Sequence, residues 1–173
     1  MKTAGVLLVV IISVFLQVTL ARYTVGGRWV FDFVLVGVVF AGLQWGPASG
    51  IVGGTVGGLL QDVLAGQIVG VGGLAKTIVG FAAGLIGTQF VLTRPQARTI
   101  IVMGATVLHR LLMLGLQGLI DQRWSGVAWG AMLAETGINT VCAFVVFQMT
   151  ATLPGVVDRR RANRRSGLSK RQW

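Results

Sequence analysis

The stretch Gly54-Thr55-Val56-Gly57-Gly58-Leu59-Leu60-Gln61-Asp62-Val63-Leu64-Ala65-Gly66 places a carboxylate near the end of a glycine-rich apolar segment. A carboxylate at membrane depth is costly and normally has both a partner and a purpose. Glycines leave one face of a helix bare, so that another helix can approach closely. The stretch therefore predicts a tightly packed membrane helix that carries one charge, and most of the functional interpretation rests on it.

The composition of the whole chain is that of an integral membrane protein. Of its 173 residues, 54% are hydrophobic and 12% are charged, and the mean hydropathy is +0.78. Soluble domains carry about one quarter charged residues. Glycine accounts for 26 residues, an excess that fits helices packed through small side chains. We therefore predict an all-α fold, a polytopic bundle of transmembrane helices.

Six apolar segments are predicted to cross the membrane, since a crossing takes about 20 helical residues. Their bounds are 4–21, 30–46, 48–66, 73–92, 97–120 and 127–151. We expect residues 1–153 to form one six-helix transmembrane domain and residues 154–173 to form a basic tail that is partly disordered. The first segment also resembles a signal peptide, but its apolar run is long for one, so we expect it to be retained.

The distribution of Lys and Arg predicts the orientation. One side carries ten basic residues, namely Lys2, Arg94, Arg98 and seven after Pro154, and the other carries Arg22, Arg28 and Arg123. Both termini are therefore expected in the cytoplasm. The tail should lie on anionic lipid headgroups through Arg159, Arg160, Arg161, Arg164 and Arg165. A juxtamembrane tail is a poor candidate for binding nucleic acid.

Two acid–base pairs are predicted at matching depths. Asp62 and Lys76 flank one short connection, about 6 Å and 5 Å from the same boundary. Arg110 and Glu135 lie on consecutive segments, about 15 Å and 12 Å deep. We interpret both pairs as mainly architectural ion pairs, because an unpaired buried charge is strongly destabilising. A contact with a partner protein, and ligand or proton chemistry, are the alternatives.

Four further polar or titratable residues lie in the predicted segments. We expect Asp32 to be interfacial and solvated, and Cys142 to act as a small buried hydrophobe. His109 and Asn139 lie near the depth of Arg110. A lone cysteine excludes an intrachain disulfide and a cysteine metal cluster.

Catalytic machinery is hard to find in this chain. There is one histidine, and there is no nucleophile elbow, phosphate loop or metal-ligand spacing. We predict that the protein is not an enzyme and needs no cofactor or metal. The one rival in this class is a small intramembrane enzyme acting on lipid through Glu135, Arg110 and His109.

The glycines recur at helical spacing. Gly50, Gly54 and Gly58 follow one another every four residues, and Gly53 and Gly57 form an adjacent ridge. Each can seat a facing helix backbone. Contacts within the bundle are one interpretation, and a groove for another protein's transmembrane helix is the other.

At 54–66 the chain is similar to the bacterial rod shape-determining protein MreD family. That family carries a Gly-x-x-x-Gly-Leu-Leu-x-Asp-x-x-(Ser/Ala)-Gly signature, followed by a Gly, a small residue and a Val-Gly-aromatic step. Here residues 72–84 read Gly-Gly-Leu-Ala-Lys-Thr-Ile-Val-Gly-Phe-Ala-Ala-Gly. The motif-level similarity covers 54–84, and the remainder agrees in hydropathy and layout.

The resemblance implies a non-enzymatic subunit of the cell-elongation machinery in the bacterial inner membrane. Its partner would be MreC, and through MreC it would connect to RodA, a class B penicillin-binding protein and MreB. The family also resembles the substrate-binding S-components of ECF transporters in fold, and a transporter subunit of that kind is the alternative function. Our hypothesis is that the transmembrane helix of MreC binds at Gly50, Gly54, Gly57, Gly58, Leu59, Leu60 and Asp62, with Lys76 as the counter-charge of Asp62.

Overall fold

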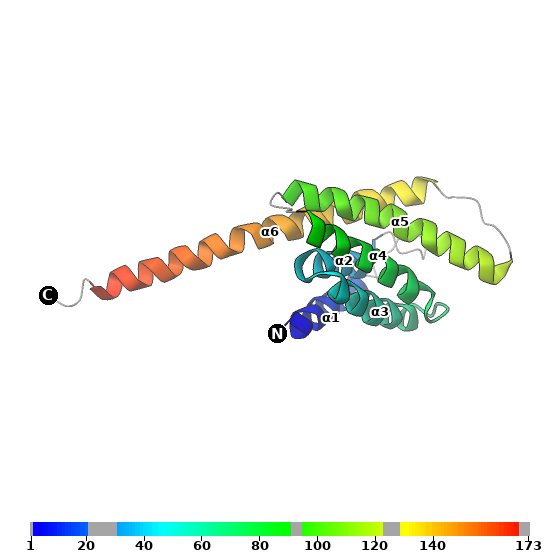
Figure 1. Cartoon of the computed structure of the whole chain (residues 1–173), viewed down its shortest axis with the longest axis horizontal. Helices are drawn as coiled ribbons and strands as arrows, with labels where there is room; N and C mark the ends of the chain where they lie inside the picture. The colour runs from blue at the N-terminus through cyan, green and yellow to red at the C-terminus, as the bar shows by residue number, and fades with distance from the viewer. Residues whose placement is uncertain (1, 21–30, 91–94, 123–128, 170–173) are drawn as a thin grey trace.

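The computed structural model describes the backbone of residues 2–20, 31–90, 95–122 and 129–169, and most side chains in these ranges up to Thr150. Within these ranges six helices follow one another: α1 (Lys2–Leu20), α2 (Phe33–Trp45), α3 (Pro47–Leu64), α4 (Val71–Gln89), α5 (Pro95–Asp121) and α6 (Trp129–Ser169). Figure 1 shows α1 to α4 gathered together, with α5 and α6 beside them. The predicted all-α class with six helical segments is confirmed.

The helices differ in how far they can reach across a membrane. Among the described residues, four helical stretches are long and apolar enough to cross one: Thr3–Leu20, Val71–Gln89, Gln96–Ile120 and Trp129–Thr150. Helix α2 has 13 residues, about 20 Å at 1.5 Å each, which is short of a hydrocarbon core of about 30 Å. The start of α2 therefore lies within the bundle, at a depth where polar groups need partners.

Local sequence explains the sharp connections. Gly46, with φ 95°, separates α2 from α3, and Pro47 occupies the first turn of α3, where its missing N–H costs no helical hydrogen bond. Gly70, with φ 104°, precedes α4 and takes a backbone conformation that side chains disfavour. Short connections of this kind place α2, α3 and α4 side by side.

The last helix continues into the predicted basic tail. Its backbone is helical to Ser169 and projects past the bundle in Figure 1. That residues 154–173 form a separate, partly disordered tail stays a prediction. Arg, which supplies five of the seven residues from 159 to 165, is among the strong helix formers. The side chains of the predicted lipid-binding arginines lie outside the described residues.

Helices α3 and α4 meet backbone to backbone, and we call this contact the glycine interface. A Cβ at Gly54 would lie 2.5 Å from the carbonyl oxygen of Lys76, and one at Gly58 would lie 2.5 Å from Cα of Gly73. A Cβ at Gly50 would overlap the carbonyl group of Gly80. Such close approach maximises dispersion contacts, which substitute for the hydrophobic effect between helices in lipid.

Two apolar clusters complete the core. The first joins α2, α4, α5 and α6 through Leu35, Val36, Val39, Val79, Ala83, Val102, Ala105, Ala143 and Phe147. The second joins α1 to α2 through Val6, Val10 and Ala41, with Val56 of α3 packed against it. The α5–α6 pair therefore attaches to the other helices mainly through α2 and α4.

Candidate functional site

The buried start of α2 gathers polar side chains from other helices. Asp32 is the N-cap of α2 and accepts a hydrogen bond from the amide of Leu35 at 2.9 Å. The amide of Asp32 donates to Oδ1 of Asn139 on α6 at 2.9 Å, and the amide of Phe33 donates to Oε1 of Gln17 on α1 at 2.8 Å. The first amides of a helix lack intrahelical partners, so α1 and α6 supply acceptors for α2 inside the bundle.

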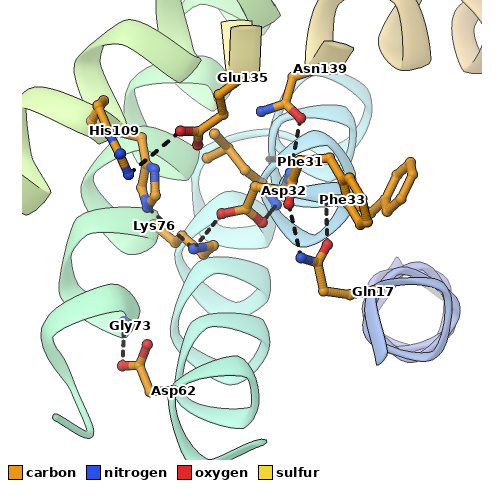
Figure 2. Close-up of polar contacts among 12 residues, drawn as sticks. Gln17, Phe31, Asp32, Phe33, Asp62, Gly73, Lys76, His109, Glu135 and Asn139 are labelled. Carbon is orange, nitrogen blue, oxygen red and sulfur yellow. Dashed lines mark hydrogen bonds and ion pairs between the residues drawn. The ribbon is translucent and has the colours of Figure 1, made fainter. Parts of the chain in front are cut away.

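Lys76 of α4 neutralises the Asp32 carboxylate. Its Nζ lies 2.8 Å from Oδ2 of Asp32 and 3.2 Å from Nε2 of His109 on α5. An ammonium group only donates, so Nε2 of His109 accepts, and the proton of the neutral ring is assigned to Nδ1. Figure 2 shows Lys76 between the two residues. All three are buried, so the arrangement couples α2, α4 and α5.

The second ion pair joins α5 to α6. Nη1 of Arg110 lies 3.5 Å from Oε2 of Glu135. The structure therefore brings together the two residues that depth counting paired. Glu135 is buried, but the Arg110 side chain is 35% exposed, so surrounding solvent or headgroups screen this pair. We call Gln17, Asp32, Lys76, His109, Arg110, Glu135 and Asn139 the polar cluster.

Asp62 has a different role from the one expected. Its Oδ2 accepts hydrogen bonds from the amides of Gly70 and Gly73, at 2.9 Å and 3.1 Å. Gly70, the N-cap of α4, has no side chain with which to cap, so a carboxylate from α3 fills that role. An acidic group also interacts favourably with the positive end of the helix dipole. A Cβ at Gly72 would overlap Oδ1 of Asp62, so glycine there admits the carboxylate.

Two expectations are therefore wrong. Lys76 pairs with Asp32 and not with Asp62, because depth counting compares heights along the membrane normal but ignores the direction in which each side chain points. Asp32 is not a solvated interfacial residue but is 4% exposed, because α2 is too short to carry its first residue to the boundary.

The predicted partner-binding residues separate into two groups. Gly50, Gly54 and Gly58 are buried against the α4 backbone, and a Cβ at Gly57 would lie 2.9 Å from Val34 of α2. These four glycines already face helices of the same chain. Two of the remaining predicted residues, Leu59 and Leu60, are exposed.

A cavity of about 70 Å³ lies between α3, α4, α5 and α6, on the side of the α3–α4 connection. Its polar lining comes from Asp32, Gln61, Asp62, Gln67, Lys76, His109, Arg110 and Glu135. Two buried polar atoms of this lining, Oε1 of Gln61 and Nδ1 of His109, have no hydrogen-bond partner in the part of the chain that the structure describes. Among the described residues no cluster of three or more His, Cys, Asp or Glu is arranged to hold a metal ion.

Sequence reasoning missed the capping roles of Gln17 and Asn139. The available signal is an amide side chain inside a mainly apolar segment, which in a membrane must find a hydrogen-bond partner. What the sequence alone does not indicate is that the partner is the first turn of α2.

Together the helices and the polar cluster define a small polytopic membrane protein whose ionised residues hold helices to one another. The chain matches the family model of the rod shape-determining protein MreD over residues 1–157. It belongs to the MreD family, and it is a membrane protein with a role in cell shape. Neither a curated protein nor a solved structure matches the chain, so the likeness to ECF S-components stays a prediction.

Proposed function

We propose that this protein is a non-enzymatic scaffold of the cell-elongation complex in the bacterial inner membrane, and that it binds the transmembrane helix of MreC. The observation that carries the proposal is the family match over residues 1–157. The polar cluster supports it, because Lys76 and Asp32 are engaged with each other and with helix ends. Through MreC the scaffold would act on RodA, a class B penicillin-binding protein and MreB.

The partner helix requires an outward surface with room for close approach. Among the described residues, Gly130 and Gly137 of α6 meet no neighbouring atom within 4 Å of the place where a Cβ would be. Gly130, Ala134 and Gly137 are exposed and lie on one face of the helix, being four and three residues apart. Exposed small residues at this spacing favour packing of a second transmembrane helix. We place the MreC helix here, and the exposed Leu59 and Leu60 of α3 form the rival surface.

Co-purification of MreC in mild detergent tests both the partner and the surface. Gly137→Leu should strongly reduce the recovery of MreC, because it fills the space that the partner backbone would use. Gly104→Leu is the matched control and should leave recovery unchanged. A Cβ at Gly104 on α5 would also meet no atom of the described residues within 4 Å. The double variant Leu59→Ala/Leu60→Ala should also retain MreC.

If Leu59→Ala/Leu60→Ala loses MreC and Gly137→Leu retains it, the binding surface is on α3 and not on α6. If the native chain itself recovers no MreC, the scaffold proposal fails in its central claim.

We also propose that both termini are cytoplasmic and that the basic tail lies on anionic headgroups. Each basic residue near such a surface contributes about 1 kcal/mol. Replacing Arg159, Arg160, Arg161, Arg164 and Arg165 by Gln should lower the share of anionic lipid that co-purifies with the protein, measured by mass spectrometry. An unchanged lipid profile would count against this role.

A further inference from the structure

We infer that the cavity between α3, α4, α5 and α6 binds water, and that it gives water access to the Lys76–Asp32 pair from the side of the α3–α4 connection. This inference does not depend on MreC. It rests on the polar atoms around the cavity, on its size and on where it meets the surface.

The first support is a pair of buried atoms that lack partners. His109 is 5% exposed, and its Nδ1 has no hydrogen-bond partner in the described part of the chain. Because Nε2 of His109 accepts from Lys76, Nδ1 carries the proton and needs an acceptor. Oε1 of Gln61 is also buried without a partner and needs a donor. Water is the ligand that meets an unpaired donor and an unpaired acceptor in one space.

The second support is the character of the cavity. Its volume is about 70 Å³, and one water occupies about 30 Å³ in the liquid. Internal water requires two to four polar partners, and the carboxylates of Asp62 and Glu135 line the same space. An empty cavity would leave Nδ1 of His109 and Oε1 of Gln61 buried without a hydrogen-bond partner, which is costly inside a protein.

The third support is the location of the cavity. Gln67, in the connection between α3 and α4, lines the cavity and is exposed. Lys76, five residues into α4, lines its inner part. The cavity therefore leads from the protein surface to an ion pair that belongs to a membrane-spanning helix. Water along this route would solvate the Lys76 ammonium and the Asp32 carboxylate from one side of the membrane.

Methionine oxidation by hydroxyl radicals tests this in the native chain. Radicals formed by microsecond radiolysis of water oxidise side chains next to bound or bulk water. Met113 lines the cavity, whereas Met132 is buried in α6 and is not among the described residues that line it. Met132 is three residues from its end of α6, about 5 Å, and Met113 is eight residues from the nearer end of α5, about 12 Å. Distance from the helix end alone would therefore predict faster oxidation of Met132 than of Met113.

In lipid nanodiscs, Met113 should be oxidised several-fold faster than Met132 and faster than Met103, whose side chain is exposed on α5. Equal rates at Met113 and Met132 would overturn the inference.

Two variants locate the water: Ala65→Phe fills the cavity, and Gln61→Leu removes the unpaired acceptor. Each should slow oxidation at Met113 without changing the rate at Met103. If both variants fold as the native chain does and Met113 is oxidised as before, the water lies elsewhere and the inference is wrong.

Discussion

Helix α4 packs on its neighbours in two contrasting ways. Toward α3 it presents backbone, with Gly54 and Gly58 so close that a single added carbon would overlap atoms of α4. Toward α2 and α5 it presents Lys76, whose long side chain reaches Asp32 and His109. The glycine interface depends on the absence of side-chain atoms, and the polar cluster depends on their presence.

The two regions should therefore fail in opposite ways. Adding an atom to the glycine interface forces two backbones apart, since close-packed interiors have little free volume. Removing a group from the polar cluster leaves a charge or an amide without a partner, and that loss is costly at low dielectric. Substitutions that add atoms to one region and remove charges from the other test this contrast directly.

The largest effect is expected from Lys76→Met. The substitution keeps much of the side-chain volume but leaves the Asp32 carboxylate buried without its cation, a loss of about 3–5 kcal/mol. Thermal unfolding in detergent, followed by circular dichroism, should show a large fall in the midpoint. The double variant Asp32→Asn/Lys76→Met should recover most of the loss, because it removes both charges. If the double variant is as unstable as Lys76→Met, loss of the Lys76–Asp32 ion pair does not explain the fall in the unfolding midpoint.

The second prediction concerns Gly54→Ala. Its Cβ would lie 2.5 Å from the carbonyl oxygen of Lys76 and 2.7 Å from Cα of Thr77. Overpacking of this kind costs about 1–3 kcal/mol. Gly104→Ala on α5 is the matched control, because that position is open, and it should be neutral or stabilising by about 0.4–1 kcal/mol. Similar unfolding midpoints for the two variants would contradict the close approach of α3 and α4.

The contrast also explains what could be predicted from the sequence. The helices were predictable because a long apolar run has few alternatives in lipid, and the spacing of Gly50, Gly54 and Gly58 indicated a close-packed face. The spacing does not say which helix occupies that face. It is α4 of the same chain, joined to α3 by a short connection, and so the glycines are unavailable to a partner.

The polar cluster was only partly predictable, for a physical reason. Depth can be counted along each segment, and it correctly placed Arg110 opposite Glu135. Depth counting failed for Asp62 because its partners are backbone amides at the start of α4. These amides carry partial positive charge, which a comparison of acidic and basic side chains does not include. Depth counting failed for Asp32 because the apolar segment is longer than the helix that it forms.

The third prediction isolates the capping role of Asp62. Asp62→Ala removes the acceptor for the amides of Gly70 and Gly73, and loss of a cap costs about 0.5–2 kcal/mol. Asp62→Asn should be much milder, since an amide oxygen still accepts these bonds. Gly72→Ala should destabilise the native chain, because its Cβ would overlap the Asp62 carboxylate. It should have a smaller effect in the Asp62→Ala background, and strictly additive losses would show that the two residues act independently.

The smallest effect is expected from Arg110→Gln. Arg110 and Glu135 form an ion pair like Lys76 and Asp32, but the N–O distance is 3.5 Å and the arginine is 35% exposed, against 2.8 Å and 4% for the lysine. Screened pairs of this kind contribute about 0–1 kcal/mol, so the unfolding midpoint should fall only slightly. Raising the salt concentration should narrow the small difference between native and variant chains, whereas the effect of Lys76→Met should persist, because the deeper pair is shielded from mobile ions. If Arg110→Gln lowers the unfolding midpoint as much as Lys76→Met does, the exposure of Arg110 does not weaken its ion pair. The contact between α5 and α6 would then depend on its ion pair as much as the contact between α2 and α4 does.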